Sequence, residues 1–321
     1  MKLKLTTWIG KLSFGFVIIC LITLLTSNSK AQENEQKERQ FEITTYKIWA
    51  KIPDSYNRID VRALLNIKTL FVESQNDLNI ILCKDFIGVT PINIRISDEK
   101  ESPLDFTQKD EIVTIKLPDK YYRKRIGKIL VTYSLKNNKE YDTDQYSRFA
   151  FEVSDTLCHI NAAITRTDNW YPKLAGHLND RLPEFHLVLN VPSKFDVMAS
   201  GKLRDVESNG TRKTYTWQNY PEITDRSLYF FVTEQKRIVK TYPDGFRIVM
   251  YIPEDAIEEN LQYISDVIHK SFCFFESRFG KVAGNEYKIM AFPYGYSGLY
   301  RSMTAPMILF TAKIVNNDIY Y

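Results

Sequence analysis

Apolar and polar positions alternate with a period of two along most of the chain, from about Phe41 to about Thr233. This period places every second side chain on one face of an extended strand, so each such run predicts a half-buried β-strand. The runs cover residues 59–67, 78–82, 92–96, 113–117, 129–135, 149–153 and 185–191. No run in this region has the spacing of a long amphipathic helix. The pattern predicts a mainly β domain, built as an antiparallel saddle or sandwich.

Two dipeptides mark tight turns between neighbouring strands. Asn209-Gly210 separates residues 201–206 from 213–217, and Asp244-Gly245 separates residues 239–242 from 246–252. Both residue pairs favour the two-residue turns that match the twist of paired strands. Each site therefore predicts a β-hairpin.

The apolar period changes after Pro253 to steps of three and four, as in a helix. Acidic residues crowd the first turns and Gly280 follows the last apolar position, which are helix start and stop signals. The apolar stripe consists of Ile257, Leu261, Ile264, Ile268, Phe272, Phe275 and Phe279. One amphipathic helix is predicted here.

Two further strands are predicted at Tyr287–Phe292 and Met307–Val315, with a loop between them. Together with the helix they open a second domain of mixed α/β type. One helix and a few short strands are too small to enclose a core of their own. We therefore expect this second domain to be truncated in the sequence.

The first 31 residues have the pattern of a secretory signal peptide. Three lysines precede the apolar run Leu12–Leu25, and Ser29-Lys30-Ala31 supplies small residues for cleavage. The alternative is an uncleaved membrane anchor, but the run is short for a span of about 20 residues. We expect cleavage after Ala31, a polar tail at residues 32–40, no stable membrane anchor, and a periplasmic or extracellular location.

The composition is that of a globular protein, with 44% hydrophobic and 26% charged residues. These values argue against a disordered, collagen-like or multi-span membrane protein. The formal net charge of +4 arises from four lysines in the first 31 residues, where no Asp or Glu occurs. The remaining residues carry 39 basic and 39 acidic side chains. A balanced chain has no summed field that attracts phosphate backbones, so we expect no nucleic-acid partner.

Three cysteines, Cys83, Cys158 and Cys273, remain after the predicted leader. They form no C-x-x-C pair and are too few for a disulfide scaffold. The sequence is compatible with one optional bridge or with three small buried apolar side chains.

Several familiar catalytic patterns are absent from the sequence. The four histidines are His159, His177, His186 and His269, and no two of them have the i, i+4 spacing of H-E-x-x-H. The string GYSGL at residues 295–299 lacks the last glycine of a nucleophile elbow. No phosphate-binding or dinucleotide-binding glycine loop follows a predicted strand.

Two sets of residues have a structural and a functional interpretation. His269, Cys273 and Glu276 stand at i, i+4 and i+7 and could hold a metal. We interpret them instead as the edge of the helical stripe, and expect no metal in this chain. The string Asp168–Pro172 (DNWYP) is typical of a packed corner or domain seam, with direct substrate contact as the less favoured alternative.

Four strings, in this order, carry a resemblance to a known family. They are WYP at 170–172, FHLVLNVP at 185–192, VMASGKL at 197–203 and TYTW at 214–217. They resemble the N-terminal β domain of aminopeptidase-N-like zinc metallopeptidases. FFESRFG at 274–280 and the strand after it are similar to the opening of that family's thermolysin-like catalytic domain. The resemblance implies a β domain at residues 41–240 and a partial catalytic domain at residues 241–321.

The resemblance also implies a mechanism. In such gluzincins, two histidines of H-E-x-x-H and a later glutamate hold one zinc, and the motif glutamate is the general base for metal-bound water. A G-x-M-E-N loop binds the free amine of the substrate. By position, residues 295–303 correspond to this loop, and the implied substrate-binding residues are Gly295, Tyr296, Ser297, Gly298 and Met303. The loop contains no acidic residue, so the amine anchor is missing or supplied elsewhere.

The sequence contains no H-E-x-x-H, so we expect no catalytic residue and no zinc in this chain. A full-length parent would hold zinc and hydrolyse peptides bound in its cleft. The alternative is a non-catalytic exported β-rich module that binds peptides or proteins.

Overall fold

The computed structural model describes residues 40–70, 77–83, 89–137, 151–160, 170–176, 183–219, 228–280, 285–292 and 307–311. The strands of the first part are β1 (Phe41–Lys51), β2 (Ile59–Thr69), β3 (Leu78–Ile81), β4 (Val89–Asp98), β5 (Phe106–Lys109), β6 (Ile112–Ile115), β7 (Ile126–Asn137), β8 (Phe151–Val153), β9 (Leu157–Ile160), β10 (Lys173–Leu174), β11 (Glu184–Pro192), β12 (Asp196–Ala199), β13 (Lys202–Ser208), β14 (Arg212–Gln218) and β15 (Phe230–Thr233). A short helix, α2 (Asp119–Lys124), precedes β7. The prediction of a mainly β chain is confirmed.

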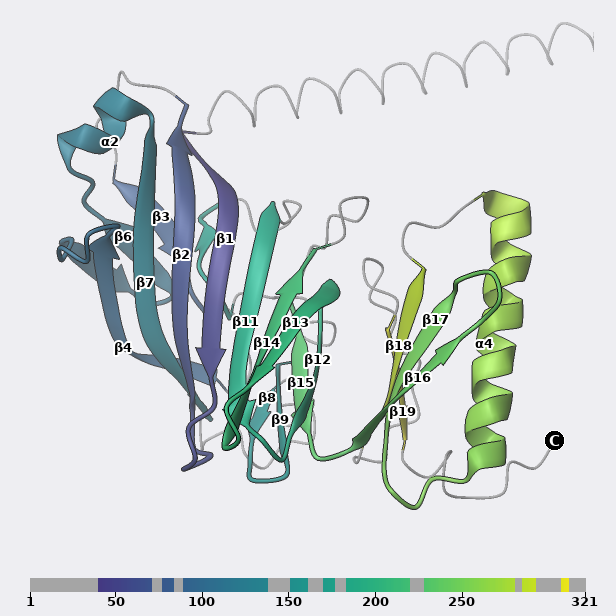
Figure 1. Cartoon of the computed structure of the whole chain (residues 1–321). Helices are drawn as coiled ribbons and strands as arrows, with labels where there is room; N and C mark the ends of the chain where they lie inside the picture. The colour runs from purple at the N-terminus through teal and green to yellow at the C-terminus, as the bar shows by residue number, and fades with distance from the viewer. Residues whose placement is uncertain are drawn as a thin grey trace, which may run out of the picture.

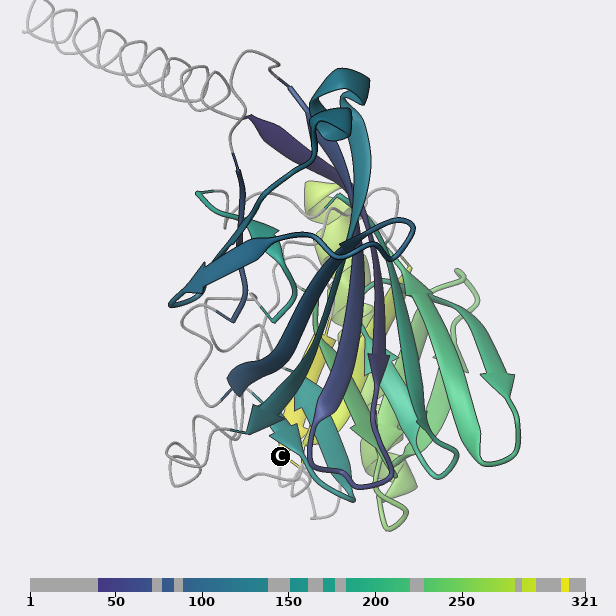
Figure 2. The same ribbon diagram turned by 90° about the vertical axis from the view of Figure 1, so that its left-hand side faces the viewer.

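A curved seven-stranded sheet forms the largest layer, in the order β13-β14-β11-β1-β2-β7-β4 (Figures 1 and 2). Neighbouring strands run antiparallel except β1 and β11, which pair in parallel. Successive side chains of a strand point to opposite faces of the sheet, and in β2 they alternate between buried and more exposed. This explains the alternation of apolar and polar residues in the sequence. The sheet is antiparallel as predicted, apart from this one parallel pair, which the sequence pattern did not predict.

Two smaller sheets complete the β part, in the orders β10-β3-β6-β5 and β12-β15-β9-β8. Buried side chains from these sheets and from the large sheet belong to one continuous apolar cluster. Its largest fully buried members include Trp170, Trp217, Tyr133, Tyr171, Phe185, Phe195 and Phe230. The core of the β part therefore lies between the large sheet and the small ones.

Trp170 lies at the centre of a packed corner, as the string around it predicted. Its indole Nε1 donates a hydrogen bond to the Leu228 carbonyl at 2.7 Å, and its own carbonyl accepts one from the Tyr133 hydroxyl at 2.7 Å. The rings of Tyr171 and Phe230 meet the indole edge-on, with centroids 5.5 Å away. Asp168 and Asn169 of the same string lie outside the described residues.

The backbone conformation at Gly201 explains why the VMASGKL string has a glycine at this position. Its backbone φ is +80°, a conformation that side chains with a Cβ rarely adopt. A Cβ at this position would lie 2.3 Å from the carbonyl oxygen of Gln218 on the paired strand. Only glycine allows β13 to start this close to the end of β14.

A fourth sheet, called the second sheet below because it belongs to the second part of the chain, has the order β16-β17-β18-β19 and is covered by one long helix (Figure 1). Its elements are β16 (Lys236–Thr241), β17 (Arg247–Ile252), α4 (Glu258–Phe279), β18 (Glu286–Phe292) and β19 (Met307–Thr311). β16 and β17 form the predicted hairpin at Asp244-Gly245, and α4 connects the parallel strands β17 and β18. The predicted hairpins, helix and strands are confirmed, while the continuation of the last strand to Val315 lies outside the described residues.

The strands β17 and β18 are buried on both faces, whereas β16 is partly exposed. Ile248, Met250 and Ile289 face Leu261 and Ile264 of α4 in a separate apolar cluster. Ile268 and Phe272 of the helical stripe pack against the same cluster, whereas Phe275 and Phe279 at its end are 53% and 81% exposed. Two clusters are compatible with two domains, and the boundary at residue 240 stays a prediction.

The other face of this sheet contacts the β part through polar groups. Lys288 is 3% exposed, and its Nζ donates hydrogen bonds to the carbonyls of Ala199, at 2.7 Å, and of Gly201. The same ammonium lies 4.6 Å from the centre of the Trp217 ring. The Tyr251 hydroxyl donates to the Val197 carbonyl at 2.6 Å. These contacts fix the second sheet against the turn that Gly201 forms.

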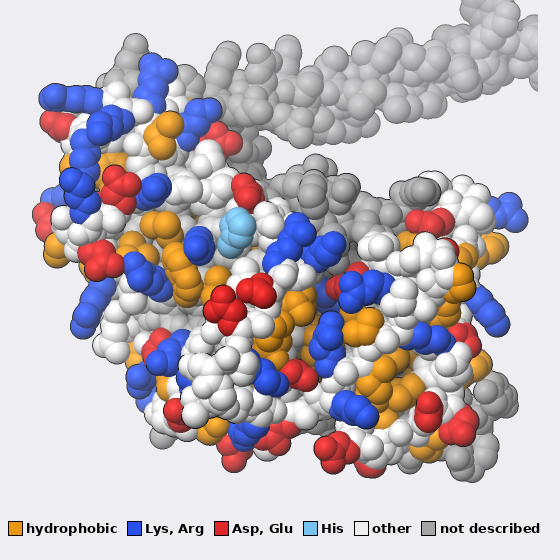
Figure 3. Space-filling view, viewed as in Figure 1, with side chains coloured by type: hydrophobic (Ala, Val, Ile, Leu, Met, Phe, Trp, Pro, Cys, Tyr) orange, Lys and Arg blue, Asp and Glu red, His pale blue; other side chains and the backbone are white. Residues whose placement is uncertain are grey.

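On the face that Figure 3 shows, Lys and Arg side chains are interspersed with Asp and Glu side chains. Mixed charge of this kind follows from the equal numbers of basic and acidic residues after the first 31.

Among the described residues, none of the helices has the length and apolarity that a bilayer crossing requires. The predicted signal peptide lies outside the described residues.

Asp98 should make the stability of the β part sensitive to acid. Its buried carboxylate accepts hydrogen bonds from Lys120 Nζ at 2.6 Å and from the amides of Lys100 and Ser102, and the Lys120 contact is the main cause that holds its pKa at about 2. Because the folded pKa is depressed, this stabilisation is complete above the unfolded pKa of about 4 and is lost as the pH falls towards 2. We expect Asp98→Asn to unfold at a lower denaturant concentration than wild type at pH 7. Below pH 4 the difference between the two unfolding midpoints should become smaller, as measured by denaturant unfolding at a series of pH values.

The matched control is Asp110→Asn, since Asp110 is exposed and has a positive φ that asparagine also tolerates. A constant gap between wild type and Asp98→Asn from pH 7 to pH 2 would contradict the prediction.

Candidate functional site

The implied substrate-binding residues Gly295, Tyr296, Ser297, Gly298 and Met303 lie outside the described residues. The described strands on either side show where their segment starts and ends in the fold. β18 ends at Phe292 and the parallel strand β19 begins at Met307. The segment therefore leaves the carboxyl end of β18, which is the end where loops of parallel strands commonly bind ligands.

The described histidines do not fit the ligand set of a gluzincin. His159 is buried in β9 and stacks on Phe231 with ring centroids 5.4 Å apart. His186 lies on β11, with Nε2 3.2 Å from a carboxylate oxygen of Glu184. His269 is on α4. The group of potential metal ligands that converges among the described residues contains only one of these three histidines, so the described residues do not supply two histidines to one zinc, and His177 lies outside them.

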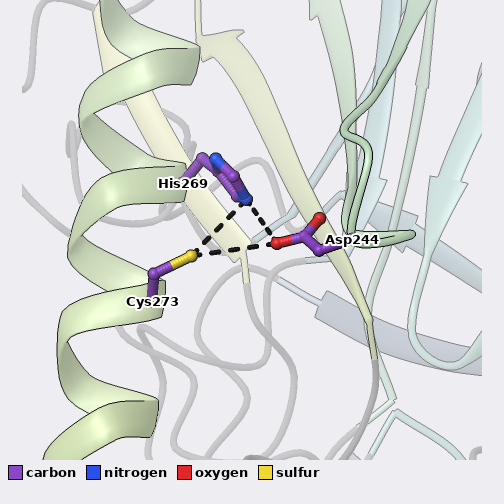
Figure 4. A group of neighbouring side chains, drawn as sticks. All are labelled: Asp244, His269 and Cys273. Carbon is purple, nitrogen blue, oxygen red and sulfur yellow. Dashed lines mark hydrogen bonds and ion pairs between the residues drawn. The ribbon is translucent and has the colours of Figure 1, made fainter.

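One group of potential metal-binding side chains does converge among the described residues: Asp244, His269 and Cys273 (Figure 4). His269 Nε2 lies 2.7 Å from Asp244 Oδ2 and 3.5 Å from Cys273 Sγ. The distance from Cys273 Sγ to Asp244 Oδ2 is 3.8 Å. One nitrogen, one sulfur and one oxygen therefore point at a common position between the helix and the hairpin.

The hairpin turn orients Asp244. Its Oδ1 accepts a hydrogen bond from the Phe246 amide at 3.0 Å, within a turn closed by a bond from the Tyr242 amide to the Phe246 carbonyl at 2.8 Å. Gly245 supplies the positive φ, +84°, that this turn needs. Because one carboxylate oxygen is held by the turn, the other is directed towards α4.

The His269 ring is held by packing. It stacks on Tyr242 at a centroid distance of 3.7 Å and an interplanar angle of 18°. The Tyr242 hydroxyl donates to Asp266 Oδ1 at 2.8 Å, and Lys240 Nζ donates to the same oxygen at 2.7 Å. These bonds, that of Lys240 foremost, hold the pKa of Asp266 at about 2. The aromatic stack thus fixes Nε2 between the other two groups.

The arrangement is not that of a cysteine nucleophile. A catalytic relay needs the two nitrogens of the imidazole to face different partners, one the nucleophile and one the orienting carboxylate. Here the same Nε2 faces both Asp244 and Cys273. Desolvation, and then the charge of Asp244, raises the pKa of the Cys273 thiol, whereas a nucleophile needs it lowered. Hydrogen bonding to His269 lowers the pKa of Asp244.

The sequence pattern found two of these three residues. The i, i+4 spacing does bring His269 and Cys273 together, but the third member is Asp244 from the hairpin, not Glu276 at i+7. The sequence signal for Asp244 was its Asp-Gly turn, which predicts a hairpin and not its contact with a helix. Cys83, Cys158 and Cys273 are all free, and of these Cys158 is buried and Cys273 exposed.

Comparison with known proteins finds similar structures but no similar family model or curated sequence. No protein-family model matches the chain, and no curated protein matches it. An M1 zinc metallopeptidase from Deinococcus radiodurans has a similar structure, with a TM-score of 0.59, 14% identity, and coverage of 86% of this chain and 61% of that chain. A mutant of it bound to a Tyr-Ser-Ala substrate matches with a TM-score of 0.58 and 14% identity, covering 88% of this chain and 62% of the other.

A two-domain M1 zinc metallopeptidase mutant bound to L-tryptophan matches with a TM-score of 0.58, 14% identity, and coverage of 86% and 61%. The chain thus spans about three fifths of the length of these structures. This likeness confirms that the chain has the fold of an M1 zinc metallopeptidase over the covered part.

Proposed function

We propose that the chain is the amino-terminal part of an exported, zinc-dependent, peptidase-like protein. In this proposal residues 41–240 are its N-terminal β domain and residues 241–321 open its catalytic domain. The observation that carries the proposal is the fold likeness to M1 zinc metallopeptidases over 86% of the chain, which includes both the β part and the sheet covered by α4. The name of one such structure says that it binds a Tyr-Ser-Ala substrate.

The parts of the chain have different roles in this proposal. The segment Gly295–Met303, which follows β18 in the sequence, binds the substrate of the parent in this proposal. The 321 residues contain no H-E-x-x-H, so we assign the catalytic zinc and the general base to other residues of the parent. We further propose that residues 1–31 direct export to the periplasm or beyond, and that peptides, not nucleic acids, are the partners.

A second candidate function is a non-catalytic exported module that binds peptides or proteins. The observation that favours it is the lack of any acidic residue in Gly295–Met303, where the resemblance implies a glutamate for the substrate amine. A module of this kind would keep the cleft of the fold and lose hydrolysis.

One experiment separates the two functions. The native protein is captured from the exported fraction of the source cells with an antibody against residues 41–240, its mass is determined, and it is assayed on amino-acid 4-nitroanilides and on Tyr-Ser-Ala. We expect a mass well above that of the mature chain and turnover that a chelator abolishes and zinc restores. Purified residues 32–321 serve as the control and should show no turnover.

Two results would overturn the peptidase proposal. One is a captured protein without turnover that still binds labelled Tyr-Ser-Ala, which would establish the binding module. The other is chelator-sensitive turnover by purified residues 32–321, which would place the catalytic groups within this chain.

A further inference from the structure

We infer that Asp244, His269 and Cys273 form a zinc-binding site that clips the β16–β17 hairpin to helix α4. The three ligand atoms all lie within 4.8 Å of one another and come from two elements that are distant in sequence (Figure 4). This inference goes beyond the proposed peptidase function and concerns residues of this chain only.

The separations between the three atoms suit a tetrahedral zinc ion. Zinc bonds of about 2.0–2.1 Å to nitrogen and oxygen and about 2.3 Å to sulfur give ligand-to-ligand distances of about 3.3–3.6 Å at tetrahedral angles. The observed distance of 3.5 Å from His269 Nε2 to Cys273 Sγ falls in this range, and the 3.8 Å from Cys273 Sγ to Asp244 Oδ2 is close to it. The third distance, 2.7 Å, is that of a hydrogen bond between His269 and Asp244. A zinc ion would replace that bond and increase the distance between the two atoms by less than about 1 Å.

The convergence of the three atoms on one point distinguishes a metal site from a chain of hydrogen bonds. In a catalytic relay the two nitrogens of the imidazole form hydrogen bonds to two different partners. In this site Nε2 faces both the carboxylate and the thiol. Without a metal, Nε2 carries the proton of its hydrogen bond to Asp244; when that proton is released, the Nε2 lone pair is directed into the space between the carboxylate and the thiol. That is the geometry by which an imidazole binds a cation.

The surrounding residues hold the ligands in place before any ion binds. The Phe246 amide fixes one oxygen of Asp244, and the Tyr242 ring fixes the plane of His269. Such outer contacts orient the ligands of metal sites and raise their affinity. His269 and Cys273 stand one helical turn apart on a 22-residue helix, so their spacing is set by the backbone.

The set of donor atoms selects the kind of ion. One thiolate, one imidazole and one carboxylate suit zinc, whereas magnesium and calcium prefer oxygen ligands alone. The Asp244 side chain is 48% exposed and that of His269 is 18% exposed, so an ion can enter from solvent. With three protein ligands, a water molecule completes a tetrahedral shell.

The experiment uses the mature chain, residues 32–321, freed of metal by dialysis against a chelator. We expect one zinc per chain to bind, the thermal unfolding midpoint to rise with zinc, and cobalt to produce the absorption band of a thiolate–cobalt bond. Cys273→Ser should remove the band. Asp244→Asn and His269→Gln should each weaken zinc binding by at least about 100-fold, because even residues outside the ligand shell change affinity by about 10- to 100-fold.

The matched controls are His186→Gln, which removes a histidine that also contacts a carboxylate, and Glu276→Gln, which removes the carboxylate one turn beyond Cys273. Both should bind zinc as the unchanged chain does. Unfolding of each variant without metal verifies that it is folded. Three results would each overturn the inference and leave three hydrogen-bonded side chains. The first is zinc binding that survives Cys273→Ser, and the second is binding that is lost in Glu276→Gln but not in Asp244→Asn. The third is binding by the unchanged chain that is no stronger than the background level of Cys273→Ser.

Discussion

Replacing Trp170 with alanine should lower the free energy of unfolding by about 3–5 kcal/mol, the range for removing a large aromatic side chain from a core. The indole is fully buried, contacts the rings of Tyr171 and Phe230, and donates a hydrogen bond to the Leu228 carbonyl at 2.7 Å. The substitution removes this packing and leaves a buried carbonyl without its donor. Equilibrium unfolding in urea, followed by tryptophan fluorescence and by circular dichroism, measures the change.

Two variants separate the contributions to this effect. Trp170→Phe keeps most of the ring and removes the N–H donor, so it should cost about 1–3 kcal/mol. Trp49→Ala removes a partly exposed indole whose ring is covered by Lys47 and Arg62, and should cost less than Trp170→Ala. Equal losses for Trp170→Ala and Trp49→Ala would contradict the prediction that Trp170 is the centre of the corner.

Replacing Lys288 with methionine should weaken the contact between the β part and the second sheet, at a cost of about 2–4 kcal/mol. The side chain is 3% exposed, and its ammonium donates to the carbonyls of Ala199 and Gly201 above the Trp217 ring. Methionine has a similar length but no donor, so two buried carbonyls lose this partner and the contact with the indole face is lost. Urea unfolding gives the overall change, and limited proteolysis should cut near residue 235 sooner than in the unchanged chain.

The control for this prediction is Lys202→Met, because Lys202 is an exposed lysine on β13, next to the same turn. It should change stability by no more than about 0.5 kcal/mol. If Lys288→Met matches Lys202→Met in both measurements, the buried ammonium does not hold the two parts together.

The difference between Lys288 and Lys202 shows where sequence patterns stop being informative. Both lysines lie in strands, and a strand pattern alone treats a lysine as a solvent-exposed position. Lys288 is buried because its strand, β18, is covered on both faces, by α4 on one side and by the β part on the other. That environment is created by segments far away in the chain, so local periodicity does not reveal it.

The helical stripe gives the converse case, in which apolar residues of the predicted buried face are exposed. The spacing correctly predicted α4 and its end at Gly280. Leu261 and Ile264 at its start are buried, whereas Phe275 and Phe279 at its end are largely exposed in the structure. Spacing defines which residues share a face, but the elements that pack against the helix determine how much of that face is covered.

The sequence by itself determined many local features of this protein: a large part of its β-strands, the two hairpins, and the long helix with its start and stop. These follow from side-chain periodicity and turn residues, which act over a few neighbouring positions. Only the tertiary structure decided the parallel pairing of β1 with β11, the burial of Lys288, and the meeting of Asp244 with His269 and Cys273. Each of these joins segments 25 or more residues apart, and nothing in the short-range pattern of one segment specifies which distant segment it will contact.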